Sequence, residues 1–259
     1  MILRDFHIHS SFSDGEASPE EIIKAAISAG LTHIGISDHS YTYFDEEPCR
    51  NMKDMDKYIG EINALKEKYK NKIKVYCGIE QDYYSDGPDK RLDYVIGSVH
   101  YLELGGKFVC IDYGVERLKN AVNDYFGGDI YSLIEEYYRV IGDIVSKTNA
   151  DIIGHFDIIS KYNEKYHLFD ENNERYRAAW KKAVDKLLKA NAIFEINTGA
   201  ISRGHRHQPY PSDEIRDYIA KNGGKFVLSS DSHHIKDICA EFKKFELHQN
   251  SCKFQPDML

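Results

Sequence analysis

The sequence has little of what a secreted, membrane-bound or nucleic-acid-binding protein needs. Its five cysteines are odd in number, widely spread and without a CxxC pair, which indicates reduced thiols of a cytoplasmic protein and not a disulfide framework. It has no apolar run as long as a membrane span, and we expect no signal peptide. Basic residues are scarce, with 34 lysines and arginines against 42 acidic residues, which disfavours nucleic acid as a partner. A small anionic substrate stays compatible, because bound divalent cations would reverse the local charge.

The chain does have a regular alternation of short apolar runs and amphipathic stretches. The expected strands span residues 2–8, 32–37, 72–79, 94–99, 151–154, 192–196 and 225–230, and the expected helices span residues 20–29, 52–69, 130–147, 171–190 and 212–221. Ser18, Asp129 and Ser212 stand where they would cap three of these helices. The alternation predicts βαβ units and an α/β fold, a closed or nearly closed barrel of seven strands in one domain spanning residues 1–259. For the segment after Phe245, a helix and a tail both stay open.

Side chains of the types that bind metals follow most of these apolar runs. They are His7 and His9 after the first run, then Asp38 and His39, Glu80, His100, His155, and finally Asp231 and His233. The carboxyl ends of parallel strands converge at one mouth of a barrel, so residues that are far apart in sequence are expected to meet there. This pattern predicts a multinuclear metal site.

The spacing of the first and last motifs supports this interpretation. His7 and His9 are separated by one residue, so on an extended strand both side chains leave the same face and can bind one ion. Asp231 and His233 repeat the spacing with a carboxylate. A pair of polar residues at a strand exit is the ordinary alternative for either motif alone.

The middle motifs add a bridging group. Asp38 and His39 are adjacent and face opposite sides of a strand, so we assign His39 to the metals and Asp38 to orienting a ligating imidazole. Glu80 can bridge two cations, which a neutral imidazole cannot do. His100 or His155 alone would more often be a buried core histidine, but because they end consecutive strands we expect both to be ligands.

These motifs resemble those of the polymerase and histidinol phosphatase (PHP) family. The matching segments are DFHIHS at 5–10, SDG at 13–15, SDH at 37–39, GIE at 78–80, GSVH at 97–100, GHFD at 154–157 and SDSH at 230–233. They span nearly the whole chain in the family's order. The resemblance implies a distorted, TIM-like (β/α)7 barrel that holds three divalent transition-metal ions (Zn, Mn and/or Fe) at the C-terminal strand ends.

The resemblance also implies how the ions are shared. One ion would be held by His7, His9, Glu80 and Asp231, a second by Glu80, His100 and His155, and a third by His39, His233 and Asp14. For Asp14 two interpretations stay open, because Ser13-Asp14-Gly15 is also an ordinary turn and some family members place a histidine where this chain has Gly15.

Within the family the chain resembles free-standing histidinol-phosphatases, through FEINTG at 194–199 and PYPS at 209–212. That implies hydrolysis of L-histidinol phosphate to L-histidinol and phosphate, in histidine biosynthesis, by a metal-bridging hydroxide. Arg203 is the expected phosphate clamp, because a guanidinium matches phosphate oxygens in two-point contact. His205 is a candidate for phosphate contact, and Asp157 and His205 are both candidates for protonating the leaving group. Arg206 and His207 are expected to be solvated.

Three alternatives stay open. The first is a PHP phosphoesterase acting on another small phosphomonoester or on nucleic-acid phosphodiesters, although the latter needs a basic track. The second is an amidohydrolase, whose barrels also open with HxH, but the third strand here offers Glu80 and no bridging lysine. The third is a metal-binding module without catalysis, for which a defective ligand set would be expected. The sequence gives no indication of the oligomeric state.

Overall fold

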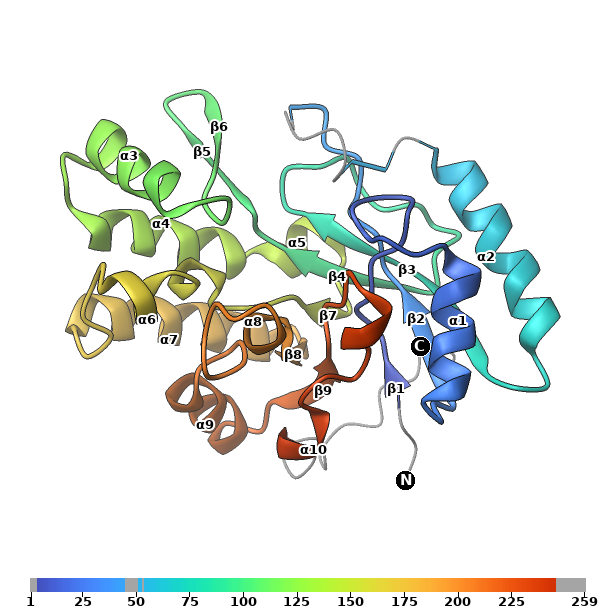
Figure 1. Cartoon of the computed structure of the whole chain (residues 1–259). Helices are drawn as coiled ribbons and strands as arrows, with labels where there is room; N and C mark the ends of the chain where they lie inside the picture. Colours follow the sequence, from blue (N-terminus) through green and yellow to red (C-terminus); the bar gives the residue numbers. More distant parts are fainter. Residues whose placement is uncertain (1–3, 45–50, 53, 246–259) are drawn as a thin grey trace.

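The computed structural model describes residues 4–44, 51–52 and 54–245 (Figure 1). The first two residues of the expected strand 2–8, and the segment after Phe245, therefore lie outside the described residues. No helix in the described ranges is long and apolar enough to cross a bilayer.

Seven parallel strands form one sheet in the order β1-β2-β3-β4-β7-β8-β9. Their bounds are Arg4–Asp5 (β1), His33–Ile36 (β2), Lys74–Asp82 (β3), Tyr94–Ser98 (β4), Ile152–Ile153 (β7), Ile193–Asn197 (β8) and Lys225–Ser229 (β9). The chain beyond β9 meets the chain beyond β1 in a parallel bridge between Ile8 and Ser232, where the amide of His9 donates to the Ser232 carbonyl at 2.9 Å. The sheet is therefore a nearly closed barrel, which confirms the predicted fold class.

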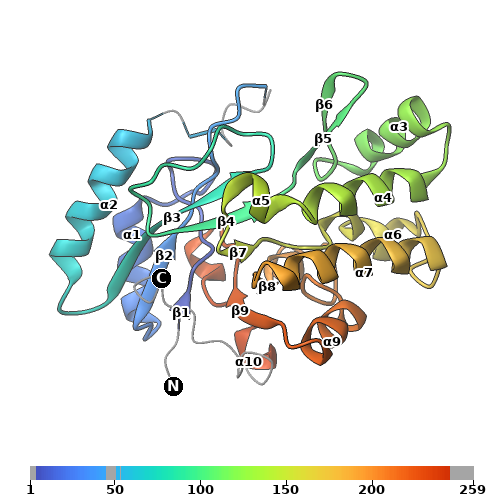
Figure 2. The same ribbon diagram turned by 180° about the vertical axis from the view of Figure 1, so that it is seen from behind.

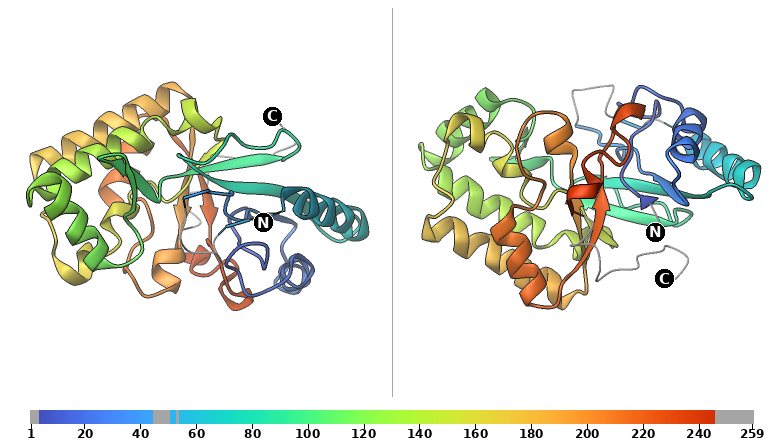
Figure 3. Two further views of the ribbon diagram at one scale, coloured as in Figure 1. Left: turned by 90° about the horizontal axis from the view of Figure 1, so that it is seen from above. Right: turned by 60° about the horizontal axis from the view of Figure 1, so that its bottom comes forward.

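Helices lie around the outside of the barrel, mostly in two groups at opposite ends of the molecule. They are Pro19–Ser28 (α1), Met55–Tyr69 (α2), Val115–Phe126 (α3), Ile130–Ile141 (α4), Ile144–Thr148 (α5), Asn163–Tyr166 (α6), Glu174–Lys189 (α7), Gly199–Ser202 (α8), Asp213–Lys221 (α9) and Phe242–Phe245 (α10). Figures 1 and 2 show α1 and α2 beside β1 to β3, while α3, α4, α6, α7 and α9 gather at the other end of the molecule. The strands run between these two groups of helices in the views of Figure 3.

The helix ends follow the local sequence signals with one exception. Ser18 and Glu21 form the full capping box at the start of α1, and the Asp129 carboxylate accepts from the Tyr131 amide at the start of α4. Ser212 stands at the cap position of α9, but its side chain makes no capping hydrogen bond. Its amide donates to Asp157 instead.

Several parts of the fold differ from the sequence-based expectation, and the short helices α6, α8 and α10 are among the elements that were not predicted. The expected helix 130–147 is divided into α4 and α5 at Gly142, where an added Cβ would lie only 3.2 Å from the Ala183 Cα of α7. In addition, β5 (Tyr101–Leu104), β6 (Lys107–Cys110) and α3 were not predicted. The turn of this antiparallel hairpin contains Gly105 and Gly106, both at positive φ, a Gly-Gly signal that could have indicated it.

The barrel interior below the mouth is filled by aromatic and aliphatic side chains. Tyr94 is buried there and its hydroxyl donates to the Phe6 carbonyl at 2.5 Å, directly before His7 in the chain. Its side chain packs so closely on Gly35 and Gly78 that an added Cβ would lie 2.2 Å from its hydroxyl oxygen at Gly35 and 2.2 Å from its ring at Gly78. The floor of the site is thus a packed core that fixes the backbone from which the first histidines project.

Candidate metal centre

The structure brings all nine predicted metal ligands together at the mouth of the barrel. His7 and His9 continue from β1, Asp14 lies in the loop before α1, His39 follows β2, Glu80 lies within β3, His100 follows β4, His155 follows β7, and Asp231 and His233 follow β9. Glu80 does not end its strand as expected, because β3 continues to Asp82. His39 and Glu80 form a parallel bridge between their chain segments.

Glu80 is the carboxylate around which five imidazoles gather. Its Oε2 lies 2.9 Å from His39 Nδ1, 3.5 Å from His7 Nε2 and 3.6 Å from His9 Nε2. Its Oε1 lies 2.8 Å from His155 Nε2 and 3.3 Å from His100 Nε2. Each oxygen therefore faces a different set of histidines, the arrangement expected of a carboxylate that can bridge two cations.

Two further carboxylates lie close to histidines of the cluster, including His233, which does not contact Glu80. Asp14 lies 3.3 Å from His233 Nε2, 3.4 Å from His39 Nε2 and 3.5 Å from His9 Nδ1. Oδ1 of Asp231 lies 3.3 Å from His9 Nε2 and 3.7 Å from His7 Nε2. The side chain of Asp14 thus points at the cluster. From the sequence alone, both a ligand and an ordinary turn residue were possible at this position.

Three groups of these residues have ligand atoms within 4.8 Å of one another: His9, Asp14, His39 and His233; His7, His9 and Glu80; and His39, Glu80 and His100. They overlap with the implied sharing of three ions, but His9 also stands beside Asp14, and His39 beside His100. Neither His155 nor Asp231 belongs to any of these groups. The assignment of each ligand to one ion stays a prediction.

The donor set fits divalent transition metals. Several lone-pair atoms in the cluster are buried without a hydrogen-bond partner, namely His7 Nε2, both ring nitrogens of His9, and Glu80 Oε2. Buried polar atoms are normally paired, and leaving one unpaired costs about 1–3 kcal/mol. Imidazole and carboxylate donors without thiolates suit Zn, Mn or Fe(II). Because a neutral imidazole has one lone pair, cations bound in the cluster would pair with His7 Nε2, with one ring nitrogen of His9 and with Glu80 Oε2.

The pKa shifts within the cluster also indicate a site where the carboxylates favour positive charge. Burial alone would lower the pKa of His39, but Asp14 and Glu80 outweigh burial and raise it to about 10. Burial alone would raise the pKa of Glu80, yet the surrounding histidines, His39 and His100 foremost, hold it well below its usual range. For His9, burial together with its neighbours His233 and His39 lowers the pKa to about 3. The carboxylates thus favour the protonated, positively charged form of His39. Bound metal ions would supply that positive charge instead.

Residues behind the ligands hold several of them in place, and sequence reasoning assigned a role to only one of these. Glu195 accepts a hydrogen bond from the His7 ring at 2.9 Å, and Asp82 lies 3.3 Å from His100 Nδ1. Asp38, expected to orient an imidazole, instead accepts hydrogen bonds from Ser10 and Ser13. It therefore positions the loop that carries Asp14, and the signal that could have revealed Glu195 is an acidic residue inside an apolar strand.

A cleft of about 170 Å³ opens above the metal-type ligands. Arg203 and His205 both line it, together with Asp112, Lys161 and Tyr210, which sequence reasoning did not select. The Arg203 guanidinium donates to Asp231 Oδ2 at 2.8 Å, and its side chain keeps 29 % of its surface exposed. Burial and the positive charge of Lys161 lower the pKa of His205 to about 4, so its ring is neutral at pH 7.

Asp157 and Arg206 lie away from this cleft. Asp157 is fully buried and accepts hydrogen bonds from Arg206 Nη1 at 3.2 Å and from the Ser212 amide at 3.0 Å. The expectation that Arg206 is solvated was wrong, because its guanidinium is buried against Asp157 and over the ring of Tyr210. His207 is exposed, as expected. The role of Asp157 as a proton donor stays a prediction, and its ion pair suits anchoring the 203–212 segment.

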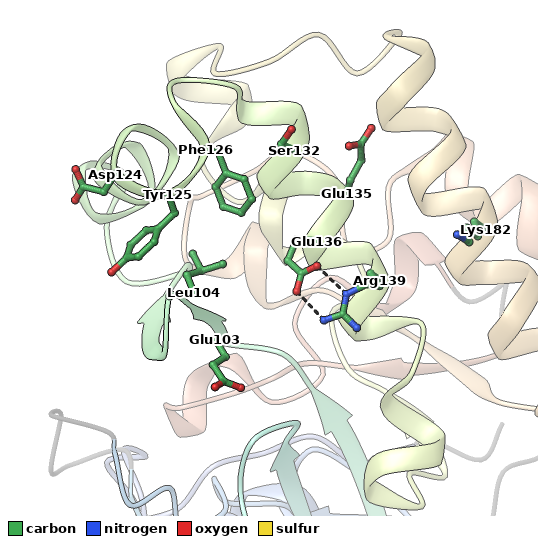
Figure 4. Close-up of a pocket in the computed structure, with 11 residues that line it drawn as sticks. Glu103, Leu104, Asp124, Tyr125, Phe126, Ser132, Glu135, Glu136, Arg139 and Lys182 are labelled. Atoms are coloured by element: carbon green, nitrogen blue, oxygen red, sulfur yellow. Dashed lines mark hydrogen bonds and ion pairs between the residues drawn. The ribbon is translucent and has the colours of Figure 1, made fainter.

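A larger pocket of about 800 Å³ lies elsewhere, between the β5–β6 hairpin, α3 and α4 (Figure 4). Among its charged lining residues, Arg139 donates to Glu136 at 2.7 Å and 2.6 Å. It contains none of the nine clustered ligands. Because most of the clustered histidines and carboxylates line the smaller cleft, we take that cleft as the functional site.

Comparison with known proteins agrees with this geometry. The family model of the PHP domain matches residues 5–199, about three quarters of the chain. The chain belongs to the PHP family. The matched region contains seven of the nine clustered side chains, and Asp231 and His233 lie beyond it.

Curated PHP relatives cover most of the chain. A histidinol-phosphatase from Lactococcus lactis is 28% identical over 254 residues, covering 90% of this chain and 84% of its own. A probable histidinol-phosphatase from Schizosaccharomyces pombe is 26% identical over 253 residues, covering 90% and 80%.

Solved structures show the same barrel. A putative histidinol phosphatase from Listeria monocytogenes superposes with a TM-score of 0.81 at 20% identity, covering 94% of this chain and all of its own. A histidinol phosphate phosphatase from Lactococcus lactis, complexed with zinc, L-histidinol and phosphate, superposes with a TM-score of 0.71 at 25% identity, covering 97% and 94%.

Proposed function

We propose that this protein is a metal-dependent phosphatase that hydrolyses L-histidinol phosphate to L-histidinol and inorganic phosphate. The observation that carries the proposal is the cluster of five imidazoles around Glu80 beneath a cleft that also presents Arg203. The PHP relatives named histidinol-phosphatases support the choice of substrate. A cleft of about 170 Å³ suits a small phosphomonoester better than a nucleic-acid strand.

The proposed ligands are the nine clustered side chains, and we propose that they hold three divalent ions drawn from Zn, Mn and Fe. They are His7, His9, Asp14, His39, Glu80, His100, His155, Asp231 and His233. When bound, such ions lower the pKa of a coordinated water and neutralise charge on phosphate oxygens. A relative of the same fold that was solved with zinc supports zinc as one of these ions. The five cysteines, odd in number, widely spread and without a CxxC pair, support a cytoplasmic location.

The protein's own groups would bind and orient the phosphate. Two nitrogens of Arg203 are used by Asp231, with Nη1 donating to its carbonyl at 2.6 Å and Nη2 to its carboxylate. Each of these nitrogens carries a second N–H, and a partly exposed guanidinium can present those to phosphate oxygens. Arg203 would thus align the phosphate with the cluster through Asp231.

His205 is the better-placed candidate for the leaving-group proton, because it lines the cleft and Asp157 does not. Its pKa of about 4 applies to the empty cleft, where burial and Lys161 disfavour the charged ring. A bound phosphate dianion would act in the opposite direction and raise that pKa, so that His205 could hold a proton near the ester oxygen.

The test is phosphate release by the purified protein supplied with Zn or Mn, measured with L-histidinol phosphate and, in parallel, with a single-stranded oligonucleotide. We expect phosphate from L-histidinol phosphate and no nucleotide release. Nucleotides released from the oligonucleotide, with no phosphate from L-histidinol phosphate, would instead establish a PHP phosphodiesterase.

A further inference from the structure

Two polar residues at the end of β8 lie directly behind the ligand cluster, and neither was a predicted ligand. Glu195 and Asn197 are fully buried and alternate along the strand, so their side chains leave the same face. That face is the barrel interior, because both side chains contact residues of the cluster. A buried carboxylate and amide in an apolar strand are costly unless every polar atom is paired.

Their polar atoms contact three of the proposed ligands. Oε2 of Glu195 accepts from His7 Nδ1 at 2.9 Å, and Oε1 accepts from the backbone amide of His155. The side-chain amide of Asn197 donates to Glu195 Oε1 at 2.7 Å and to Asp231 Oδ2 at 3.1 Å. Ligands that follow three different strands, β1, β7 and β9, are thereby tied to one strand.

The direction of these hydrogen bonds determines which atoms face the cluster. An ionised carboxylate can only accept, so the Nδ1 atom of His7 must carry the proton that Glu195 accepts. The lone pair of His7 is then available at Nε2, the atom that points at Glu80 and Asp231 without a hydrogen-bond partner. In the same way, Asn197 and Arg203 occupy Asp231 Oδ2 and leave Oδ1 to face His7 and His9.

We propose that Glu195 is a positioning residue that fixes His7 for metal binding through Nε2, and that Asn197 does the same for Asp231 through Oδ1. The proposal deepens the metal-dependent function above and rests on it. Partners of this kind orient ligating histidines and raise metal affinity.

The donor count makes Glu195→Gln a sharp test. All three partners of Glu195 are donors: the His7 ring, the His155 amide and the Asn197 side chain. Glutamine has only one acceptor oxygen. The His155 amide and the Asn197 side chain both donate to the Oε1 position, so the oxygen of glutamine would stay there and its NH2 group would face His7. That group would donate to Nδ1, move the ring proton to Nε2 and remove the lone pair needed by the metal.

Asp151→Asn is a matched control. This substitution also replaces a carboxylate by an amide of the same shape. The Asp151 carboxylate accepts a hydrogen bond from the Val95 amide at 2.8 Å. It lies directly before β7, at the end of the strand opposite the mouth.

The experiment measures zinc affinity by titration of metal-stripped protein, zinc content by elemental analysis, and the His7 ring nitrogens by ¹⁵N NMR of the zinc-loaded protein. In the wild type and Asp151→Asn we expect His7 to be coordinated through Nε2 with a proton on Nδ1. In Glu195→Gln we expect that signature to be lost and zinc affinity to fall about 10- to 100-fold. Wild-type zinc affinity and an unchanged His7 signature in Glu195→Gln would overturn the proposal.

If Glu195→Gln does not fold, a wild-type His7 coordinated through Nδ1 would still overturn the part assigned to Glu195, and Asn197→Ala tests the part assigned to Asn197. It leaves the His7–Glu195 pair in place and releases Asp231, so we expect weaker zinc binding with the His7 signature intact; wild-type zinc affinity would overturn the part assigned to Asn197. These readouts are independent of turnover. If the wild type binds zinc as expected but releases no phosphate from L-histidinol phosphate, the proposed function fails and the positioning role stands. If it binds no zinc, both fail.

Discussion

Replacing Arg203 by methionine removes a guanidinium that lies between Asp231 and the open cleft. Its hydrogen bond to the Asp231 carboxylate is 2.8 Å long, and the side chain is 29 % exposed, so it can also reach a bound phosphate. A hydrogen bond to a charged group contributes about 1.5–3 kcal/mol, and each ~1.4 kcal/mol is a factor of ten. We therefore expect kcat/KM to fall about 10- to 150-fold.

The assay is phosphate release with zinc content confirmed for every variant. Because the guanidinium would contact the phosphate and not the rest of the substrate, the loss should be similar for L-histidinol phosphate and for p-nitrophenyl phosphate. Arg203→Lys should recover part of the activity, since lysine keeps the charge but not the fork. Arg139→Met, in the other pocket, is the control and should match the wild type. A loss in Arg203→Met below threefold at full zinc content would refute the reasoning.

Two further predictions concern the barrel core. Gly78→Ala should destabilise the protein by about 1–3 kcal/mol, because its Cβ would lie 2.2 Å from the buried Tyr94 ring. Gly60→Ala, in open space on α2, should instead stabilise it by about 0.5–1 kcal/mol in urea unfolding, and equal effects would contradict this packing. Burial raises the pKa of the Cys77 thiol to about 12, so at pH 8 it stays protonated. Peptide mass spectrometry should find Cys77 alkylated by iodoacetamide in urea but not in the native state, and rapid native labelling would be the opposing result.

The clustering of the proposed ligands was predictable from sequence because the topology of a parallel barrel brings the residues after its strands together. Parallel strands place their carboxyl ends at one mouth, so residues directly after apolar runs, such as His100 and His155, need no further information. Glu80 lies in the cluster as predicted, even though β3 continues past it to Asp82. The nearly closed barrel of seven strands followed from the same alternation of elements.

What the sequence could not reveal depends on side-chain direction and register. Asp38 faces Ser10 and Ser13 instead of a histidine, and a choice between two faces of a strand needs the tertiary contacts. Glu195 stands inside a strand and acquires its role only because β8 lies between β7 and β9 in the sheet. Arg206 is buried because the loop after α8 returns it against Asp157, which no local pattern indicates.

Removal and return of the metal ions test the central claim most directly. The purified protein would be stripped with a chelator, its metal content measured, and phosphate release from L-histidinol phosphate followed before and after addition of Zn or Mn. We predict that activity disappears with the ions and returns as up to three equivalents are bound. Full turnover by protein shown to be free of metal would contradict the assignment of the clustered histidines and carboxylates as the catalytic centre.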